Sequence, residues 1–144
     1  MYSLQSDSIQ NNSNSELDYH KLSLNPEIKL EWLLSNPEKN WDFYQISKHD
    51  VITLDWLKAF PQSKWDFYQL SQRESLTLDW LLSFPCADWD FYRISSNKSL
   101  TLDWLLAFSE AKWNFNEISL RDDFTLDWLD YFPSVKQQII DDLL

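Results

Sequence analysis

Nine tryptophans divide this chain of 144 residues into a repeat with a period of 24 residues. They occupy two columns of positions, one at Trp32, Trp56, Trp80, Trp104 and Trp128, and the other at Trp41, Trp65, Trp89 and Trp113. A fixed period between about 20 and 50 residues is typical of solenoids, propellers and other repeat arrays. The repeat covers residues 17–136, and we expect the tryptophans, which recur beside Leu and Phe, to form the core between copies.

Each copy contains two short segments with helical character. The segment TLDWLKAF at 53–60 has Thr53 at a favourable N-cap position and Asp55 in the first turn, where the helix dipole favours a carboxylate. The segment WDFYQLS at 65–71 follows Ser63, which we expect to cap it. Helices of about two turns are unstable alone, so we expect them to be stabilised by stacking on the next copy.

Glycine is absent from the whole sequence. Its absence removes the phosphate-binding GxxxxGK[ST] and GxGxxG loops, the G-x-S-x-G nucleophile turn and the usual EF-hand loop. The segment ITLDW has some strand-like alternation, but β-propellers and β-helices mark their tight turns with Gly. We therefore expect an all-α fold, a short solenoid of about five 24-residue two-helix repeats with a C-terminal capping helix.

Three regions are expected along the chain. Residues 1–16 are rich in Ser, Asn and Gln and are typical of a disordered tail, residues 17–136 form the repeat array, and residues 137–144 form the cap. The segment VKQQIIDDLL at 135–144 places apolar side chains on one helical stripe, at Val135, Ile139 and Leu143.

The segment NPEIKLEWLLSNPEKNWDFYQIS at 25–47 resembles the 24-residue repeats of giant DNA virus proteins, which have a WDW-x-x-LS core followed by NP-x-IT and a second NP. Its Asn-Pro pairs at 25–26 and 36–37 match that pattern, whereas later copies depart from it, for example with Arg-Glu at 73–74. The resemblance spans 17–136. It implies helical repeats and a viral origin, and it implies no activity. Because the N-terminus also lacks a signal-peptide pattern, we expect an intracellular protein of the host cytoplasm or the virion that is not secreted.

The chain carries 23 acidic and 12 basic residues, which give a net charge of −11. This charge argues against direct binding to nucleic acid or to an anionic membrane. Many of the acids fall in two columns. The first acidic column is Asp18, Asp42, Asp66 and Asp90, with Asn114 in the last copy, and the second acidic column is Glu31, Asp55, Asp79, Asp103 and Asp127. These columns either compensate helix dipoles or imitate a phosphate backbone.

A column of mostly tyrosines is the candidate surface for a partner. The tyrosine column is His20, Tyr44, Tyr68, Tyr92 and Asn116. Because His and Asn replace Tyr there, we do not expect full burial. Tyr is enriched in binding surfaces, since it offers a large area with few rotatable bonds. The polar residues that follow the three tyrosines are Gln45, Gln69 and Arg93, and we include them in this surface.

No arrangement of residues typical of catalysis or metal binding occurs in the sequence. His20 and His49 fall in different columns, and Cys86 is the single thiol. We therefore expect a non-catalytic protein–protein interaction module without cofactor or metal, whose partner is another protein. The two alternatives are an acidic nucleic-acid mimic that sequesters a DNA- or RNA-binding protein, and a structural viral protein that self-associates.

Overall fold

The computed structural model describes residues 17–144, so the predicted tail at 1–16 lies outside the described residues. All regular secondary structure in this range is helical, which confirms the prediction of an all-α fold. Helical pieces recur about every 12 residues, as two pieces in each 24-residue copy require. The chain divides into two compact units, Met1–Gln69 and Leu70–Leu144.

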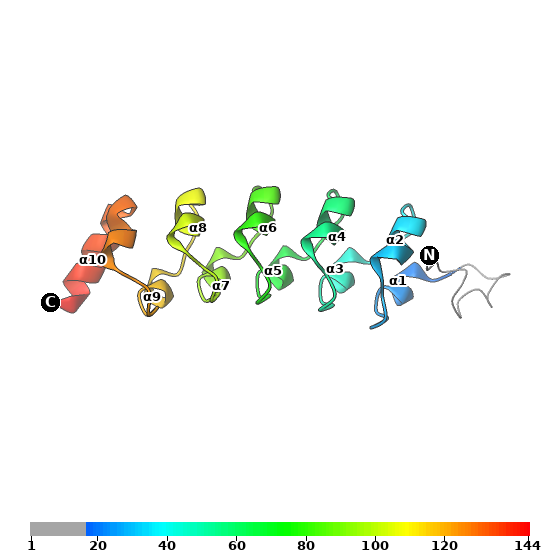
Figure 1. Ribbon diagram of the computed structural model, residues 1–144, viewed down its shortest axis with the longest axis horizontal. Coiled ribbons are helices and arrows are strands. Elements are labelled where there is room, and N and C mark those ends of the chain that lie inside the picture. The colour runs from blue at the N-terminus through cyan, green and yellow to red at the C-terminus, as the bar shows by residue number, and fades with distance from the viewer. Residues whose placement is uncertain (1–16) are drawn as a thin grey trace. The chain divides into compact units, whose positions relative to one another are not determined.

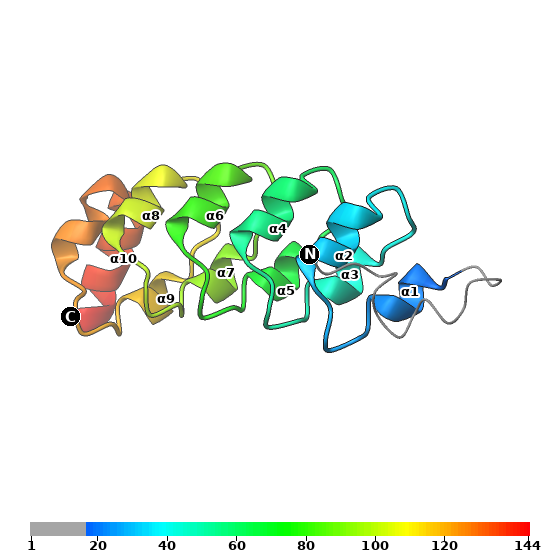
Figure 2. The same cartoon turned by 45° about the vertical axis from the view of Figure 1, so that its right-hand side comes forward.

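The first unit alternates very short helices with slightly longer ones. Its helices are α1 (Tyr19–Leu22), α2 (Leu30–Ser35), α3 (Phe43–Ile46) and α4 (Leu54–Ala59), and α5 (Phe67–Leu70) follows at the boundary. Figure 1 and Figure 2 both show α2 and α4 on one side of this unit and α1 and α3 on the other. Each copy therefore contributes one helix to each side.

The second unit continues this alternation and ends in a longer helix. Its elements are α6 (Leu78–Ser83), α7 (Phe91–Ile94), α8 (Leu102–Ala107), α9 (Phe115–Ile118), the 3-10 helix η3 (Leu126–Tyr131) and α10 (Pro133–Leu143). Proline at the first helical position suits the start of α10, which packs against η3 (Figure 2). Val135 and Ile139 are half-buried, whereas Leu143 is exposed, so the predicted stripe contributes to packing only along its first part.

Eight of the nine tryptophans are buried, with relative exposures between 2% and 7%, which confirms their prediction as core residues. Trp128 in η3 is half-buried instead. In the second tryptophan column each indole N–H donates to a backbone carbonyl five residues earlier, at 2.8 to 2.9 Å. The acceptors are the carbonyl oxygens of Asn36, Phe60, Phe84 and Phe108. These bonds satisfy the polar atom of each indole inside an apolar core.

The short helices are capped by the first acidic column, so the prediction that Ser63 caps the helix at 65–71 is wrong. The helix begins at Phe67, and Asp66 Oδ1 accepts the backbone N–H of Gln69 at 3.1 Å. The same bond recurs in the other copies at 3.0 to 3.2 Å, with Asp18, Asp42, Asp90 and Asn114 as acceptors. Asn114 fits this column because Asn caps a helix as well as Asp does.

The longer helices begin at the predicted place but without the predicted side-chain cap. Thr53 occupies the N-cap position of α4 with extended backbone, and its hydroxyl makes no capping hydrogen bond there. Asp55 lies in the first turn, as expected from the helix dipole.

A column of buried serines joins consecutive copies within each unit. Ser47 Oγ donates to the carbonyl of Phe43 at 2.7 Å and accepts the backbone N–H of Asp66 in the next copy at 2.9 Å. We call this pair of bonds the serine bridge. It recurs at Ser23 and Ser95, and Ser71 accepts the N–H of Asp90 in the same way. These four serines are at most 2% exposed.

We predict that Ser47→Ala destabilises the protein by about 1–3 kcal/mol, because the substitution leaves the backbone N–H of Asp66 without its acceptor. Urea unfolding followed by circular dichroism measures the change. Ser35→Ala is the matched control, since Ser35 is exposed at the end of α2 and its loss should change stability little. Equal stability of the two variants would contradict a structural role for the bridge.

We also predict that Trp104→Ala lowers the free energy of unfolding by about 3–5 kcal/mol, because Trp104 is 4% exposed and its removal leaves a cavity. Leu106→Ala is the control, as Leu106 lies on the same helix and is 39% exposed. Thermal unfolding of both variants decides the matter, and an unchanged melting temperature for Trp104→Ala would show that the indole is not core.

Candidate functional site

The tyrosine column lies at the second position of each short helix. Tyr44, Tyr68 and Tyr92 are 55%, 50% and 63% exposed, as the replacement by His and Asn predicts. Their exposure follows from the helix geometry, because the last residue of each of these one-turn helices points into the core, as Ile46 does at 0% exposure.

A pocket of about 530 Å³ opens beside this column in the first unit. We call it the N-terminal pocket. Two successive copies build its walls, which carry aromatic and basic side chains. These are His20, Lys39, Trp41, Phe43, Tyr44 and Lys64.

Ring contacts hold the aromatic wall of the N-terminal pocket in place. Trp41 packs edge-on against Tyr19 with ring centroids 5.0 Å apart, and Phe43 packs edge-on against Trp65 at 4.9 Å. Edge-to-face pairs of this kind contribute about 0.5–1.5 kcal/mol beyond their buried area. The pocket is therefore built on side chains that the core already orients.

Charged groups surround the same aromatic wall. His20 Nδ1 lies 3.2 Å from Asp42 Oδ2. Lys39 Nζ lies 5.9 Å from the centroid of the Tyr19 ring, and Lys48 Nζ lies 5.6 Å from that of Tyr44. Tyr44 thus combines an exposed ring with a nearby ammonium group.

An equivalent pocket of about 400 Å³ occurs in the second unit, three repeat periods later along the chain. We call it the C-terminal pocket. Tyr92, Trp113, Phe115 and Asn116 line it at the positions that His20, Trp41, Phe43 and Tyr44 occupy in the first pocket. Its remaining wall comes largely from α10, which adds Val135, Ile139 and Asp142. Residues of the tyrosine column therefore border a pocket in each unit, and equivalent positions of the repeat build both pockets.

Lys136 is the equivalent of Lys64 in the last copy, and its ammonium group is paired. Its Nζ lies 2.6 Å from Asp130 Oδ1. This hydrogen bond, with the charges of Asp130 and Asp127, raises the pKa of Lys136 above its ordinary value of 10.5 against the effect of desolvation. The positive charge of Lys136 is thus balanced by a neighbouring carboxylate.

The predicted neighbours of the tyrosines do not all share the pocket surface. Gln45 and Gln69 are half-buried, and each uses its backbone N–H for the aspartate cap. Arg93 is exposed and lines a different pocket from Tyr92. Tyr92 and Arg93 are adjacent in sequence but about 100° apart around a helix, which explains the separation.

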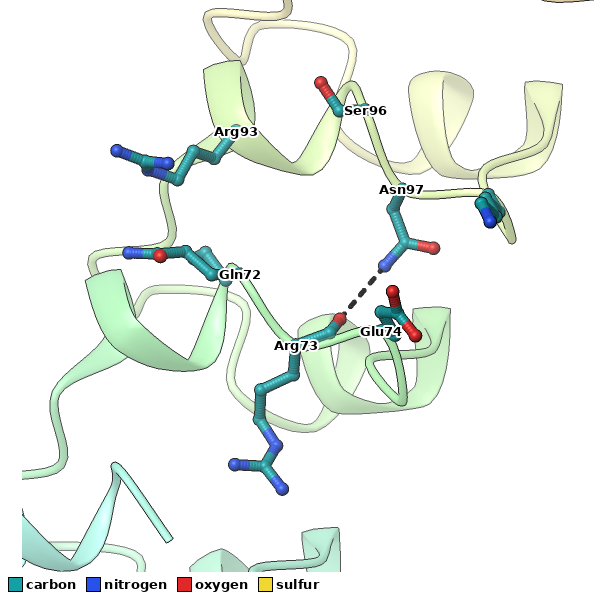
Figure 3. A pocket seen from close by; sticks show the side chains of 8 residues that line it. Gln72, Arg73, Glu74, Arg93, Ser96 and Asn97 are labelled. Atoms are coloured by element: carbon teal, nitrogen blue, oxygen red, sulfur yellow. Dashed lines mark hydrogen bonds between the residues drawn. The ribbon is translucent and has the colours of Figure 1, made fainter. Parts of the chain in front are cut away.

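The pocket that Arg93 lines has a volume of about 500 Å³ and polar walls. Figure 3 shows the side chains of Arg93 and Gln72 side by side on one wall, with Asn97 on the opposite wall. Asn97 Nδ2 donates to the carbonyl of Arg73 at 3.3 Å, and the side chain of Arg73 points away from the opening. We call this the polar pocket.

The bond from Asn97 belongs to a second set of contacts between copies that the sequence analysis missed. His49 Nε2 lies 2.7 Å from the carbonyl of Ser23, and Arg121 Nη1 donates to the carbonyl of Asn97 at 2.8 Å. The residue type in this column changes from copy to copy. Only the shared position of these residues in the repeat could have indicated the contacts, because their side chains have no common chemistry.

The two acidic columns have different environments. Carboxylates of the first column accept backbone N–H groups, and Asp66 is only 8% exposed. The second column is exposed and lies in the first turns of the longer helices, at Glu31, Asp55, Asp79, Asp103 and Asp127. Only the second column therefore presents a full set of solvent-facing carboxylates.

We predict that Asp90→Ala costs about 0.5–2 kcal/mol of stability, whereas Asp90→Asn costs little, because the amide oxygen of Asn can still accept the N–H of Arg93. Asp103→Ala and Asp103→Asn serve as controls in the second column. Chemical denaturation of the four variants tests the assignment. If both Asp90 variants lose the same stability, charge rather than capping explains the column.

No family model, curated protein or solved structure matches the chain. Within residues 17–144, no cluster of three or more His, Cys, Asp and Glu side chains forms a potential metal site. The helices in this range are all too short or too polar to cross a membrane.

Proposed function

We propose that the protein is a non-catalytic protein–protein interaction module and that the tyrosine column is its contact surface. The observation that carries this proposal is the recurrence of one aromatic pocket beside that column in both units. Tyr44, Tyr68 and Tyr92 expose at least half of their surface although they sit beside a well-packed core. Solvent-facing aromatic side chains in concave sites are typical of interaction hot spots.

The chemistry of this surface suits a protein partner. Tyr presents a large, rigid and amphipathic contact area at low entropic cost. The pockets combine aromatic walls with polar or charged side chains, which is the usual composition of a protein interface. The net charge of −11 disfavours nucleic acids and anionic membranes as partners.

The proposal includes a repeat solenoid of viral origin as the framework of this surface. Serine bridges between consecutive copies within each unit support stacking of the repeats. The viral origin and an intracellular location in the host or the virion rest on the resemblance of residues 25–47 to giant-virus repeats.

The second acidic column favours one other candidate function, an acidic mimic of nucleic acid. Its carboxylates are exposed, at Asp55, Asp79, Asp103 and Asp127. Because the first acidic column is engaged in capping, a mimic would depend on this single column. Such a partner would be held mainly by exposed charge and would be released by salt.

Two triple variants separate these functions. We predict that replacing Tyr44, Tyr68 and Tyr92 with Ser weakens partner binding at least about tenfold while helicity is retained, since truncation of a hot-spot residue costs about 2 kcal/mol or more. Replacing Asp55, Asp79 and Asp103 with Asn should change the affinity little. The partner is first isolated with the wild-type chain, and dissociation constants are then measured for both variants at two salt concentrations.

The opposite pattern would support mimicry. In that case affinity falls steeply with salt and with loss of the aspartates, and the tyrosine variant binds normally. Light scattering of the purified chain accompanies the measurement, because a partner that proves to be a second copy of this chain indicates self-assembly.

A further inference from the structure

The two equivalent pockets share the tryptophan and the phenylalanine of their aromatic walls but differ in charge. The N-terminal pocket is lined by Lys39, Lys64 and His20. In the second unit, Ala111 stands at the position of Lys39, and Lys136, the equivalent of Lys64, is paired with Asp130. The repeat therefore provides a comparison of two pockets that share a tryptophan and a phenylalanine and differ in charge.

Asp42 is the single acidic residue that lines the N-terminal pocket, and both of its carboxylate oxygens have nearby polar partners. Oδ1 accepts the N–H of Gln45 at 3.0 Å, and Oδ2 lies 3.2 Å from His20 Nδ1. A carboxylate that caps a helix in this way has much of its charge compensated locally. Lys39 and Lys64 then dominate the charge of the pocket.

The distribution of charge along the chain also makes its N-terminal part the more favourable place for an anionic group. Residues 1–69 contain 6 basic and 10 acidic residues, a difference of −4, whereas residues 70–144 contain 6 basic and 13 acidic residues, a difference of −7. The C-terminal pocket is also lined by a carboxylate, at Asp142, and by two aliphatic side chains, Val135 and Ile139. An anionic group approaching the first unit thus meets less repulsion than one approaching the second.

We propose that the N-terminal pocket binds an acidic side chain of the partner, with its carboxylate paired to Lys39 and Lys64 and its carbon chain on the aromatic wall of Trp41, Phe43 and Tyr44. This inference rests on the proposed function and adds the chemistry of the partner to it. Ammonium–carboxylate hydrogen bonds are about twice as strong as neutral ones, so they favour an acidic segment over an uncharged one of the same shape.

The test uses the full chain and short fluorescein-labelled peptides in which Leu alternates with Glu, Gln or Lys. Fluorescence anisotropy gives their dissociation constants. We expect the Glu peptide to bind about tenfold more tightly than the Gln peptide, and the Lys peptide to bind most weakly. Added salt should weaken the Glu peptide and leave the Gln peptide unchanged.

Paired substitutions assign the effect to the pocket. Lys39→Gln with Lys64→Gln should remove the preference for the Glu peptide, and Lys39→Arg with Lys64→Arg should retain it. The control is Lys21→Gln with Lys58→Gln, which makes the same change in net charge at two exposed lysines that do not line the pocket. The control should keep the preference.

Several results would overturn the inference. These are no measurable binding of the Glu peptide, equal binding of the Glu and Gln peptides, and an equal effect of the pocket and control substitutions. A phosphoserine peptide distinguishes phosphate from carboxylate, and tighter binding of that peptide through the same lysines would reassign the anionic group. A labelled single-stranded oligonucleotide that binds through Lys39 and Lys64 would also contradict a peptide ligand.

The same variants separate this inference from the proposed function. If the natural partner responds to the tyrosine triple variant but not to the lysine pair, the interaction surface is correct and the acidic specificity is wrong. If the natural partner responds to neither, the proposed function itself is wrong.

Discussion

A buried serine hydroxyl connects each copy of the repeat to the next within a unit, and the short helices depend on it. Helices of four residues have almost no intrinsic stability, because they form too few hydrogen bonds to compensate for the entropy lost in ordering their residues. Ser47 closes one such helix by donating to Phe43 and starts the next by accepting the N–H of Asp66. The aspartate then caps its own helix through Gln69. One polar side chain in each copy thereby determines where the following helix begins.

The residue at which each short helix begins determines which side chains are buried in the core and which lie on the candidate surface. With Asp42 held at the N-cap, Trp41 on one side is buried and Tyr44 on the other side is exposed. A tyrosine at this position borders a pocket because the neighbouring tryptophan and phenylalanine supply its wall. The same constraint acts in every copy, and this is why an equivalent pocket appears in the second unit.

Under the proposed function, specificity comes from the parts of the repeat that vary. Lys39 and Lys64 lie outside the helices and are replaced or neutralised three periods later, whereas the tryptophan and the phenylalanine of the aromatic wall are retained. In the function that we propose, variable charges around a shared tryptophan and phenylalanine let the two pockets select different groups on one partner. The second acidic column is exposed and adds negative charge, which under the proposed function disfavours acidic partners away from the N-terminal pocket.

The sequence by itself determined the period, the helical class, the buried tryptophans and the exposed tyrosines. These properties depend on which residue types share a position in the repeat, and 24-residue spacing reveals that directly. Local rules were less reliable for the caps, because Ser63 and Asp66 are both good capping residues and only the actual start of α5 selects between them.

The serine bridge and the bonds of His49 and Asn97 to the preceding copy were decided only by the tertiary structure. Each of the bonds joins groups 19 to 26 residues apart. Periodicity shows that such residues have equivalent surroundings, but it does not show which atoms meet. A hydrogen bond forms only when donor and acceptor come within about 3 Å at a favourable angle, and that condition is met by the path of the chain between them.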